Sequence, residues 1–281
     1  MSFLVKSNLQ AMKVVTVSEC FDDVDGEMRY LFTKVLFKID DLLFQGRSRD
    51  RLRSDDLSAV DPESITHIVP IPSETFCPPY PAGCVQALNP TAVAYHIKKP
   101  SLVAYEEGSK LDELVLRELA ACEILREHSH PNVAQYHGCQ VSNGRIIGLC
   151  FTRYRHSLQD MVNPDHLNKN AFLSSSRRLT MESIDRYVAG IESGLRHIHS
   201  LGLVHNDINP SNVMFDSDDI PVIIDFDSCS HAGESLSGVK QTFGWHDPDV
   251  QISTPDGDLA ALAEIRVWLT ASTQDEFCFK C

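Results

Sequence analysis

The 281-residue sequence lacks several features that would assign it to a particular class of protein. No apolar run approaches the roughly 18 residues that suggest a membrane-spanning helix, and the N-terminus lacks the charged-then-apolar pattern of a secretory signal. Basic residues are in deficit, with 25 Lys and Arg against 39 Asp and Glu and a formal net charge of −14. Such a surface repels the phosphates of nucleic acids and anionic membranes, so general affinity for either is not expected, although Arg47 to Arg53 could form a local basic patch.

The nine cysteines form no pattern typical of disulfide frameworks or zinc sites. They are odd in number and lie within apolar runs, which favours a reducing, intracellular compartment. Cys278-Phe-Lys-Cys281 has C-x-x-C spacing, but no second pair and no neighbouring histidine completes a tetrahedral site. Hydrophobic residues make up 43% of the chain, which is enough to bury a core in one large domain or in two modest lobes.

The most informative stretch runs from Leu203 to Phe215 and is followed by the apolar strand that ends in Asp225. It places Asp207 in a polar loop and Asn212 five residues later. A strand–loop–strand turn would bring these three side chains together. Because hard cations prefer carboxylate and amide oxygens, the pattern predicts a phosphate–magnesium centre.

Two segments have the periodicity of amphipathic helices. Residues 111–128 carry an apolar stripe with no proline or glycine, and Glu118 lies beside that stripe. Residues 180–200 carry a second stripe between a predicted N-cap at Thr180 and a C-terminal stop at Gly202. The two stripes consist of Leu114, Leu119, Cys122 and Leu125, and of Ile184, Val188, Ile191, Leu195 and Ile198.

The other periodic segments are short and apolar, as strands are. Strands are expected at residues 12–18, 65–69, 84–88, 91–98, 133–141 and 145–154. Residues 30–44 have apolar residues at both helical and strand spacing, so periodicity does not decide between the two. The polar segments 45–61 and 163–178 are expected to be exposed loops.

The stretch around Asp207 resembles the catalytic and metal-binding loops of the protein-kinase-like superfamily, His-x-Asp-x-x-x-x-Asn followed by Asp-Phe-Gly. Here the two motifs read His205-Asn-Asp-Ile-Asn-Pro-Ser-Asn212 and Asp225-Phe-Asp227. His130-Pro-Asn-Val133 and the segment Gln241 to Asp249, which is similar to the end of an activation segment, extend the resemblance over about residues 65–270. The amino-acid sequence of these loops is most similar to that of small protein-kinase domain proteins of filamentous fungi.

The resemblance implies an α+β, bilobal fold. A β-rich small lobe would span residues 65–154, and a mostly helical, C-terminally shortened large lobe would span residues 155–281. Residues 1–64 would be an N-terminal extension to which we assign no role. A helix starting at Asp258 would anchor the catalytic loop, and His205 would pack against Phe226.

The resemblance also implies the roles of individual residues. Asp207 would be the catalytic aspartate, and Lys98 paired with Glu118 would hold the nucleotide phosphates. Glu123 is a competing partner for Lys98, disfavoured because its +4 neighbour is charged. The resemblance further implies that Asn212 and Asp225 would bind Mg²⁺. The residues that would bind ATP are Gly83, Val85, Lys98, Thr152, Arg153, Tyr154 and Met214.

Several positions depart from the family pattern. No Gly-x-Gly-x-x-Gly lies between residues 65 and 98, and His96 replaces a small residue near the adenine. Asn209 replaces the catalytic-loop lysine of Ser/Thr kinases, and Asp227 replaces the glycine of Asp-Phe-Gly. These positions leave three functions open: an ATP- and Mg²⁺-dependent Ser/Thr kinase acting on a protein, a pseudokinase scaffold that binds a partner, and a small-molecule kinase of the aminoglycoside-phosphotransferase type.

Overall fold

The structure is a computed structural model that describes residues 9–25, 27–40, 42–52, 57–91, 93–102, 105–106, 108–175 and 179–279. The chain forms two compact units. The first comprises residues 1–78 and 100–113, and the second comprises residues 79–99 and 114–281. This division differs from the expected lobe boundary at residue 65, which falls inside the first unit.

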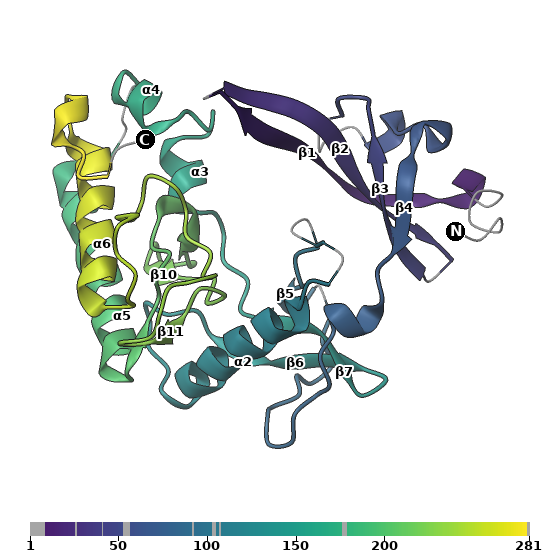
Figure 1. Ribbon diagram of the computed structural model, residues 1–281. Helices are drawn as coiled ribbons and strands as arrows, with labels where there is room; N and C mark the ends of the chain where they lie inside the picture. Colours follow the sequence, from purple (N-terminus) through teal and green to yellow (C-terminus); the bar gives the residue numbers. More distant parts are fainter. Residues whose placement is uncertain are drawn as a thin grey trace. The chain divides into compact units, whose positions relative to one another are not determined.

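The first unit contains a four-stranded antiparallel sheet with strand order β1-β2-β3-β4 (Figure 1). Its strands are β1 (Lys13–Val24), β2 (Glu27–Ile39), β3 (Leu42–Ser48) and β4 (Thr66–Pro70). The segment 30–44, which periodicity left undecided, forms parts of β2 and β3. The expectation of a loop from residue 45 onward is wrong as far as Ser48, because β3 is hydrogen-bonded to β2 on one side and to β4 on the other.

The expected strand at residues 65–69 is therefore β4, but it belongs to this sheet and not to the sheet that carries Lys98. Phe37 and Phe44 pair across β2 and β3 and stack at 5.7 Å between ring centroids. Ile65 and Ile68 are buried in the same apolar cluster. This cluster gives the first unit its own core.

The second unit begins with a three-stranded sheet of order β5-β7-β6. Its strands are β5 (His96–Lys98), β6 (Tyr136–Ser142) and β7 (Arg145–Phe151), and helix α2 (Leu111–Glu127) precedes β6. Leu119, Cys122 and Leu125 of α2 are buried with residues of β7, as the apolar stripe predicts. The strand expected at 91–98 is reduced to β5, and Ala92 lies outside the described residues. The strand expected at 84–88 is only an isolated bridge between Gln86 and Cys139.

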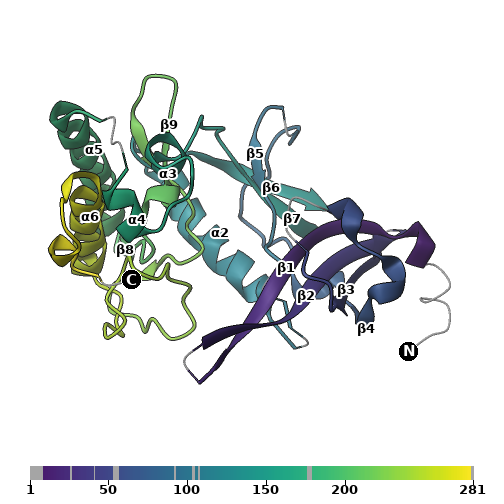
Figure 2. The same cartoon turned by 90° about the horizontal axis from the view of Figure 1, so that it is seen from above.

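The rest of the second unit is mostly helical. Its helices are α3 (Leu158–Val162), α4 (Lys169–Leu173), α5 (Met181–Ser200) and α6 (Pro255–Thr270), and α5 lies beside α6 (Figures 1 and 2). Thr180 caps α5 by accepting a hydrogen bond from the Ser183 amide, as expected. Four short strands surround the predicted catalytic loop: β8 (Leu203–Val204), β9 (Val213–Phe215), β10 (Pro221–Ile223) and β11 (Ser230–His231).

Short 3-10 helices complete the described part of the chain. They are η1 (Leu9–Ala11), η2 (Leu57–Ala59), η3 (Pro62–Ser64), η4 (Ser73–Thr75), η5 (Pro210–Asn212) and η6 (Gln274–Glu276). Within the described residues, no helix has the length and apolar character that crossing a membrane requires.

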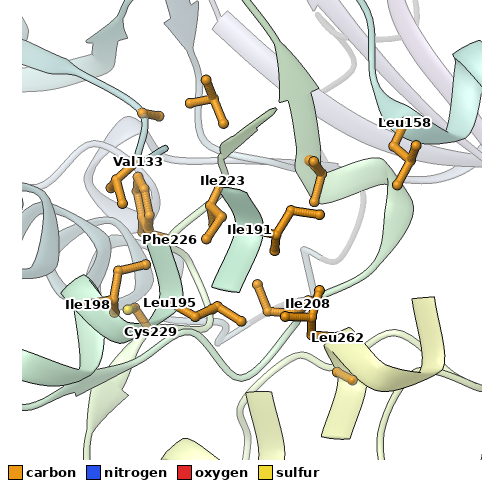
Figure 3. Packing of buried hydrophobic residues seen from close by; sticks show 14 of the residues in the cluster. Val133, Leu158, Ile191, Leu195, Ile198, Ile208, Ile223, Phe226, Cys229 and Leu262 are labelled. Carbon is orange, nitrogen blue, oxygen red and sulfur yellow. The ribbon is translucent and has the colours of Figure 1, made fainter. Parts of the chain in front are cut away.

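The core of the second unit joins α5 to the loops that follow it. Figure 3 shows Ile191, Leu195 and Ile198 of α5 in one apolar cluster with side chains from the catalytic loop, β10 and α6. Those partners include Ile208, Ile223, Phe226 and Leu262. The loops that carry the predicted functional residues are thus packed against a closely packed apolar core.

The expected exposed loop at 163–178 is wrong at its centre. It contains α4, in which Phe172 is 1% exposed and stacks on Trp268 at 4.3 Å. Lys169 is also buried and forms an ion pair with Glu264 of α6, while donating a 2.5 Å hydrogen bond to the Gly244 carbonyl. These contacts hold the segment against α6. Residues 176–178 of the expected loop lie outside the described residues.

Candidate active site

Lys98, the last residue of β5, lies between two carboxylates. Its Nζ is 2.6 Å from Glu118 Oε1 and 2.5 Å from Asp225 Oδ1. Glu118 reaches it from α2, where it is only 5% exposed. Asp227 Oδ2 is farther away, at 3.9 Å from the same ammonium. Lys98 thus joins a strand, a helix and the loop after β10.

The charges of this cluster perturb one another. Burial acts to lower the pKa of Lys98, but Glu118, Asp225 and Asp227 together raise it. Burial acts to raise the pKa of Asp225, but Lys98 holds it below its usual range. The pKa of Glu118 is raised, because burial outweighs the attraction of Lys98. At neutral pH the pair of Lys98 and Asp225 is therefore ionised.

Glu123, the competing partner for Lys98, has other contacts. Its Oε1 accepts a 2.9 Å hydrogen bond from the Val85 amide, and its Oε2 pairs with Arg126 at 2.9 Å. Glu118 is the residue of α2 that meets Lys98, because it faces the same side as the buried stripe.

The predicted catalytic loop is held by Asp258, near the start of α6. Asp258 is 1% exposed, and its carboxylate accepts 2.8 Å hydrogen bonds from the backbone amides of His205 and Asn206. It also lies 2.8 Å from His199 Nε2. The anchoring that the family resemblance implied is present. A buried carboxylate with several donors fixes a loop strongly, because charge-assisted hydrogen bonds are roughly twice as strong as neutral ones.

His205 is fully buried, and the hydrogen-bond partners of its ring are backbone groups. Its Nε2 lies 2.9 Å from the Ile224 carbonyl, its Nδ1 accepts from the Asp207 amide, and its ring packs edge-to-face on Phe226 at 5.8 Å. These partners assign the proton to Nε2. The ring therefore links the two loops without facing the pocket.

The Asp207 carboxylate is held by three nitrogen donors. Oδ1 accepts from the Thr242 amide at 2.8 Å and from Asn209 Nδ2 at 3.3 Å, and Oδ2 accepts from Asn212 Nδ2 at 3.2 Å. Asn209 Nδ2 also lies 3.2 Å from Thr242 Oγ1. Asn209, which stands where the family has a lysine, thus connects the catalytic loop to the activation-like segment.

Asn212 and Asp225 come from neighbouring backbone segments. The Asn212 carbonyl accepts a 3.0 Å hydrogen bond from the Ile224 amide, beside Asp225. Because Asn212 donates its amide nitrogen to Asp207, its side-chain oxygen is directed away from that carboxylate. Asp225 has φ +67°, a conformation that costs energy for a residue other than glycine and that often marks functional sites. Among the described residues, no three of the His, Cys, Asp and Glu side chains form a metal-binding group.

A pocket opens beside Lys98 and Asp225. Of the residues predicted to bind nucleotide, it is lined by Lys98, Thr152, Arg153, Tyr154 and Met214. Its other walls are His96, Ala134, Phe151, Ile224 and Asp225. Burial lowers the pKa of His96, helped by Arg153 and Lys98, so this ring is neutral at pH 7. A mostly apolar pocket that also carries the charges of Lys98, Arg153 and Asp225 suits a ligand with an apolar part and an anionic part.

The structure does not bring Gly83 and Val85 to this pocket, so their predicted role is not supported. The Val85 carbonyl accepts from the Cys139 amide at 2.8 Å, which places this segment along β6, across β7 from Lys98. Gly138 permits the approach, since a Cβ there would lie 2.6 Å from the Ala87 nitrogen. Gly83 adopts φ +92°, and a Cβ added to it would meet no atom of the described residues within 4 Å, so the space around that position is open.

Sequence reasoning missed Lys240. Its Nζ lies 3.5 Å from Asp227 Oδ2 and 3.8 Å from Asp225 Oδ2. Although partial burial acts to lower it, the pKa of Lys240 is raised because Asp227, Asp225 and Asp207 stabilise the ammonium. A single lysine in a polar segment gives no sequence signal. The extra carboxylate at Asp227 was the available hint, because a partly buried acid needs a cation nearby.

Comparison with known proteins gives the class to which this arrangement belongs. The family model described as "Protein kinase domain" matches residues 83–258, more than half of the chain. The chain therefore belongs to the protein kinase domain family, and the expectation of an α+β, protein-kinase-like fold is confirmed.

Individual relatives are distant. The chain is 25% identical over 227 residues to "Serine/threonine-protein kinase Tao" of Drosophila melanogaster, covering 79% of this chain and 19% of that protein. It is 32% identical over 162 residues to "Serine/threonine-protein kinase/endoribonuclease IRE2" of Homo sapiens, which covers 53% of this chain and 16% of that protein. A third match, "Serine/threonine-protein kinase/endoribonuclease IRE1" of Hypocrea jecorina, is 28% identical over 152 residues and covers 50% of this chain and 12% of that protein. In each case the match spans less than a fifth of the relative's length.

Proposed function

We propose that this chain is an ATP- and Mg²⁺-dependent protein kinase that transfers the γ-phosphate to a serine or threonine hydroxyl of a protein. One observation carries the proposal: Lys98 lies within 2.6 Å of both Glu118 and Asp225 at the edge of the pocket. These residues come from a strand, a helix and a loop. A partly buried ion cluster of this kind adds little net stability, and ionisable groups with perturbed pKa values beside a pocket are candidates for a functional site.

The residues present fit a nucleotide and its metal. The apolar side chains of Ala134, Phe151, Met214 and Ile224 line the pocket together with residues 152–154 and would contact a purine, and Lys98 lines the same pocket. Asp225 and Asn212 offer carboxylate and amide oxygens, the ligand types that Mg²⁺ prefers. When bound, Mg²⁺ would neutralise charge on the phosphates. Lys98 would hold the phosphates while Glu118 fixes the lysine.

Asp207 is placed to orient the acceptor. Three nitrogen donors fix its carboxylate, so little reorganisation is needed when a hydroxyl arrives. In this role Asp207 accepts a hydrogen bond from the hydroxyl and takes its proton as the new oxygen–phosphorus bond forms and the bond from the γ-phosphorus to the bridging oxygen breaks, with ADP as the leaving group. Thr242 connects this carboxylate to the activation-like segment, which supports a protein acceptor over a small molecule. The names of the relatives support serine or threonine as the acceptor.

A pseudokinase scaffold is the second candidate, and a specific observation favours it. Gly83 and Val85, the only residues that resembled a glycine-rich loop, are on the β6 side of the sheet and away from the pocket. A nucleotide in this pocket would therefore receive no cover from them. The chain would then bind a partner, with weak transfer or none.

An acceptor assay separates these candidates. The purified chain is incubated with γ-labelled ATP and Mg²⁺, with either a generic protein acceptor such as casein or an aminoglycoside. We expect label on the protein, dependence on Mg²⁺, and loss of transfer in Asp225→Asn but not in Asp256→Asn, an exposed position on α6. Label only on the aminoglycoside, or nucleotide binding without transfer to either acceptor, would contradict the proposal.

We also propose that the protein acts inside the cell, as one of the small protein-kinase domain proteins of filamentous fungi that its catalytic loop resembles. Free thiols support this location. Cys122, Cys139, Cys150 and Cys229 are buried as free thiols. Fluorescence of a tagged chain in cells tests this proposal, and secretion into the medium would contradict it.

A further inference from the structure

The site has more acidic groups than one lysine can balance. Glu118, Asp225 and Asp227 all lie within 3.9 Å of Lys98 Nζ, and Asp207 stands on the adjacent loop. The catalytic loop from residue 205 to residue 212 contains no lysine or arginine. A polyphosphate would add further negative charge. Besides the Mg²⁺ proposed above, a cation of the protein on the Asp207 side of the site would help to balance this charge.

Lys240 is the cation in the right place. Asp225 lies between two lysines, because Oδ1 contacts Lys98 and Oδ2 is 3.8 Å from Lys240. The side chain of Lys240 is 63% exposed, against 27% for Lys98. Its contacts of 3.5 and 3.8 Å are longer than the 2.5 and 2.6 Å contacts of Lys98. An exposed, loosely paired ammonium can move to a phosphate oxygen at little cost.

The backbone of Lys240 is fixed on both sides. The buried hydroxyl of Ser228 donates a 2.6 Å hydrogen bond to the Lys240 carbonyl. The next residue, Gln241, donates from Nε2 to the Asn206 carbonyl at 3.2 Å, and the Thr242 amide donates to Asp207. The side chain of Lys240 therefore starts from a defined point beside Asp207 and Asp225.

We propose that Lys240 is a phosphate-binding residue that contacts the terminal phosphate of the nucleotide, and that Asp227 and Ser228 hold it in position. The inference rests on the proposed function and names a residue of that same site. It gives a physical reason for Asp227, because this carboxylate is the partner that keeps Lys240 over the site when no nucleotide is bound. It also provides the positive charge that Asn209 cannot provide, since its amide is neutral and bonded to Asp207 and Thr242.

Comparison of ATP and ADP binding tests the proposal without requiring turnover. Dissociation constants for Mg²⁺·ATP and Mg²⁺·ADP are measured by calorimetry for the wild type, Lys240→Gln, Lys240→Arg and Asp227→Asn. We expect Lys240→Gln to weaken ATP binding about tenfold, as the loss of one charge-assisted hydrogen bond does, and to leave ADP binding unchanged. Lys240→Arg should restore most of the preference for ATP, and Asp227→Asn should lose part of it. Lys110→Gln, at an exposed lysine paired with Glu113, is the control.

The other outcomes are distinct. If Lys240→Gln keeps the wild-type ratio of the two constants, or binds ATP more tightly because Lys240 blocks the site, the inference is overturned while the proposed function stands. If the wild type binds neither nucleotide, the proposed function fails and the inference fails with it. Melting temperatures without nucleotide show whether each variant is folded.

Discussion

Removal of the Asp258 carboxylate should destabilise the second unit through the catalytic loop. Asp258 is 1% exposed and accepts hydrogen bonds from two backbone amides, those of His205 and Asn206. Asp258→Ala leaves both donors without an acceptor. At about 1–3 kcal/mol for each unsatisfied buried donor, the expected loss in free energy of unfolding is about 4 kcal/mol. Asp258→Asn keeps one acceptor oxygen, so its loss in free energy of unfolding should be about half of the loss in Asp258→Ala.

Chemical denaturation followed by tryptophan fluorescence is the assay. Both tryptophans, Trp245 and Trp268, are in the second unit and pack edge-to-face at 5.7 Å, so their signal reports on this unit alone. The control is Asp256→Ala, at an exposed position in the first turn of α6, which should lose only the helix-dipole contribution of about 0.3–1 kcal/mol. An Asp258→Ala variant within about 1 kcal/mol of this control would refute the reasoning.

Three further predictions concern other parts of the second unit. Gly138→Ala should lose about 2 kcal/mol in chemical denaturation, because φ is +127° and the new Cβ would meet the Ala87 backbone; Gly144→Ala, with open space around it, should lose less, and equal losses would contradict the contact. Burial and the neighbouring His197 lower the pKa of His130 in the folded state. Below about pH 6.5 the unfolded chain therefore binds more protons than the folded chain does, and the free energy of unfolding decreases as the pH is lowered. His130→Gln should flatten this fall between pH 7.5 and 5.5, and an unchanged slope would argue against it. Lys98→Met should abolish the rise in melting temperature that Mg²⁺·ATP causes in the wild type, and an undiminished rise would place the nucleotide elsewhere.

The sequence predicted those parts of the fold that depend on local pattern. The stripes of α2 and α5 and the Thr180 cap depend on residues within one element, and the structure confirms them except at Leu114, which is 40% exposed, and at Val188, which is only half-buried. Glu118 could be distinguished from Glu123 because helical phase decides which side chain faces the core. The segment 30–44 could not be assigned, because pairing with other strands and not its own periodicity makes it β2 and β3.

The errors at the site come from contacts between distant segments. The position of Gly83 and Val85 depends on a glycine more than fifty residues away, at Gly138. Lys169 looked like a surface residue because its partner, Glu264, is ninety-five residues away in the chain. Lys240 was missed for the same reason, since its contacts with Asp227 and Asp225 depend on the fold and not on a motif.

The rate of phosphate transfer from labelled ATP to a protein acceptor, compared between the wild type and Asp207→Asn, tests the central claim most directly. Asn has the same shape as Asp and keeps one acceptor oxygen for the three donors that hold Asp207, so the substitution removes the proton acceptor at a loss of about 1–3 kcal/mol in stability, and a melting curve shows that the variant is folded. We predict a rate at least about 100-fold lower in the variant, the usual contribution of a general base. Equal rates in the two proteins, or no transfer by the wild type, would contradict the account.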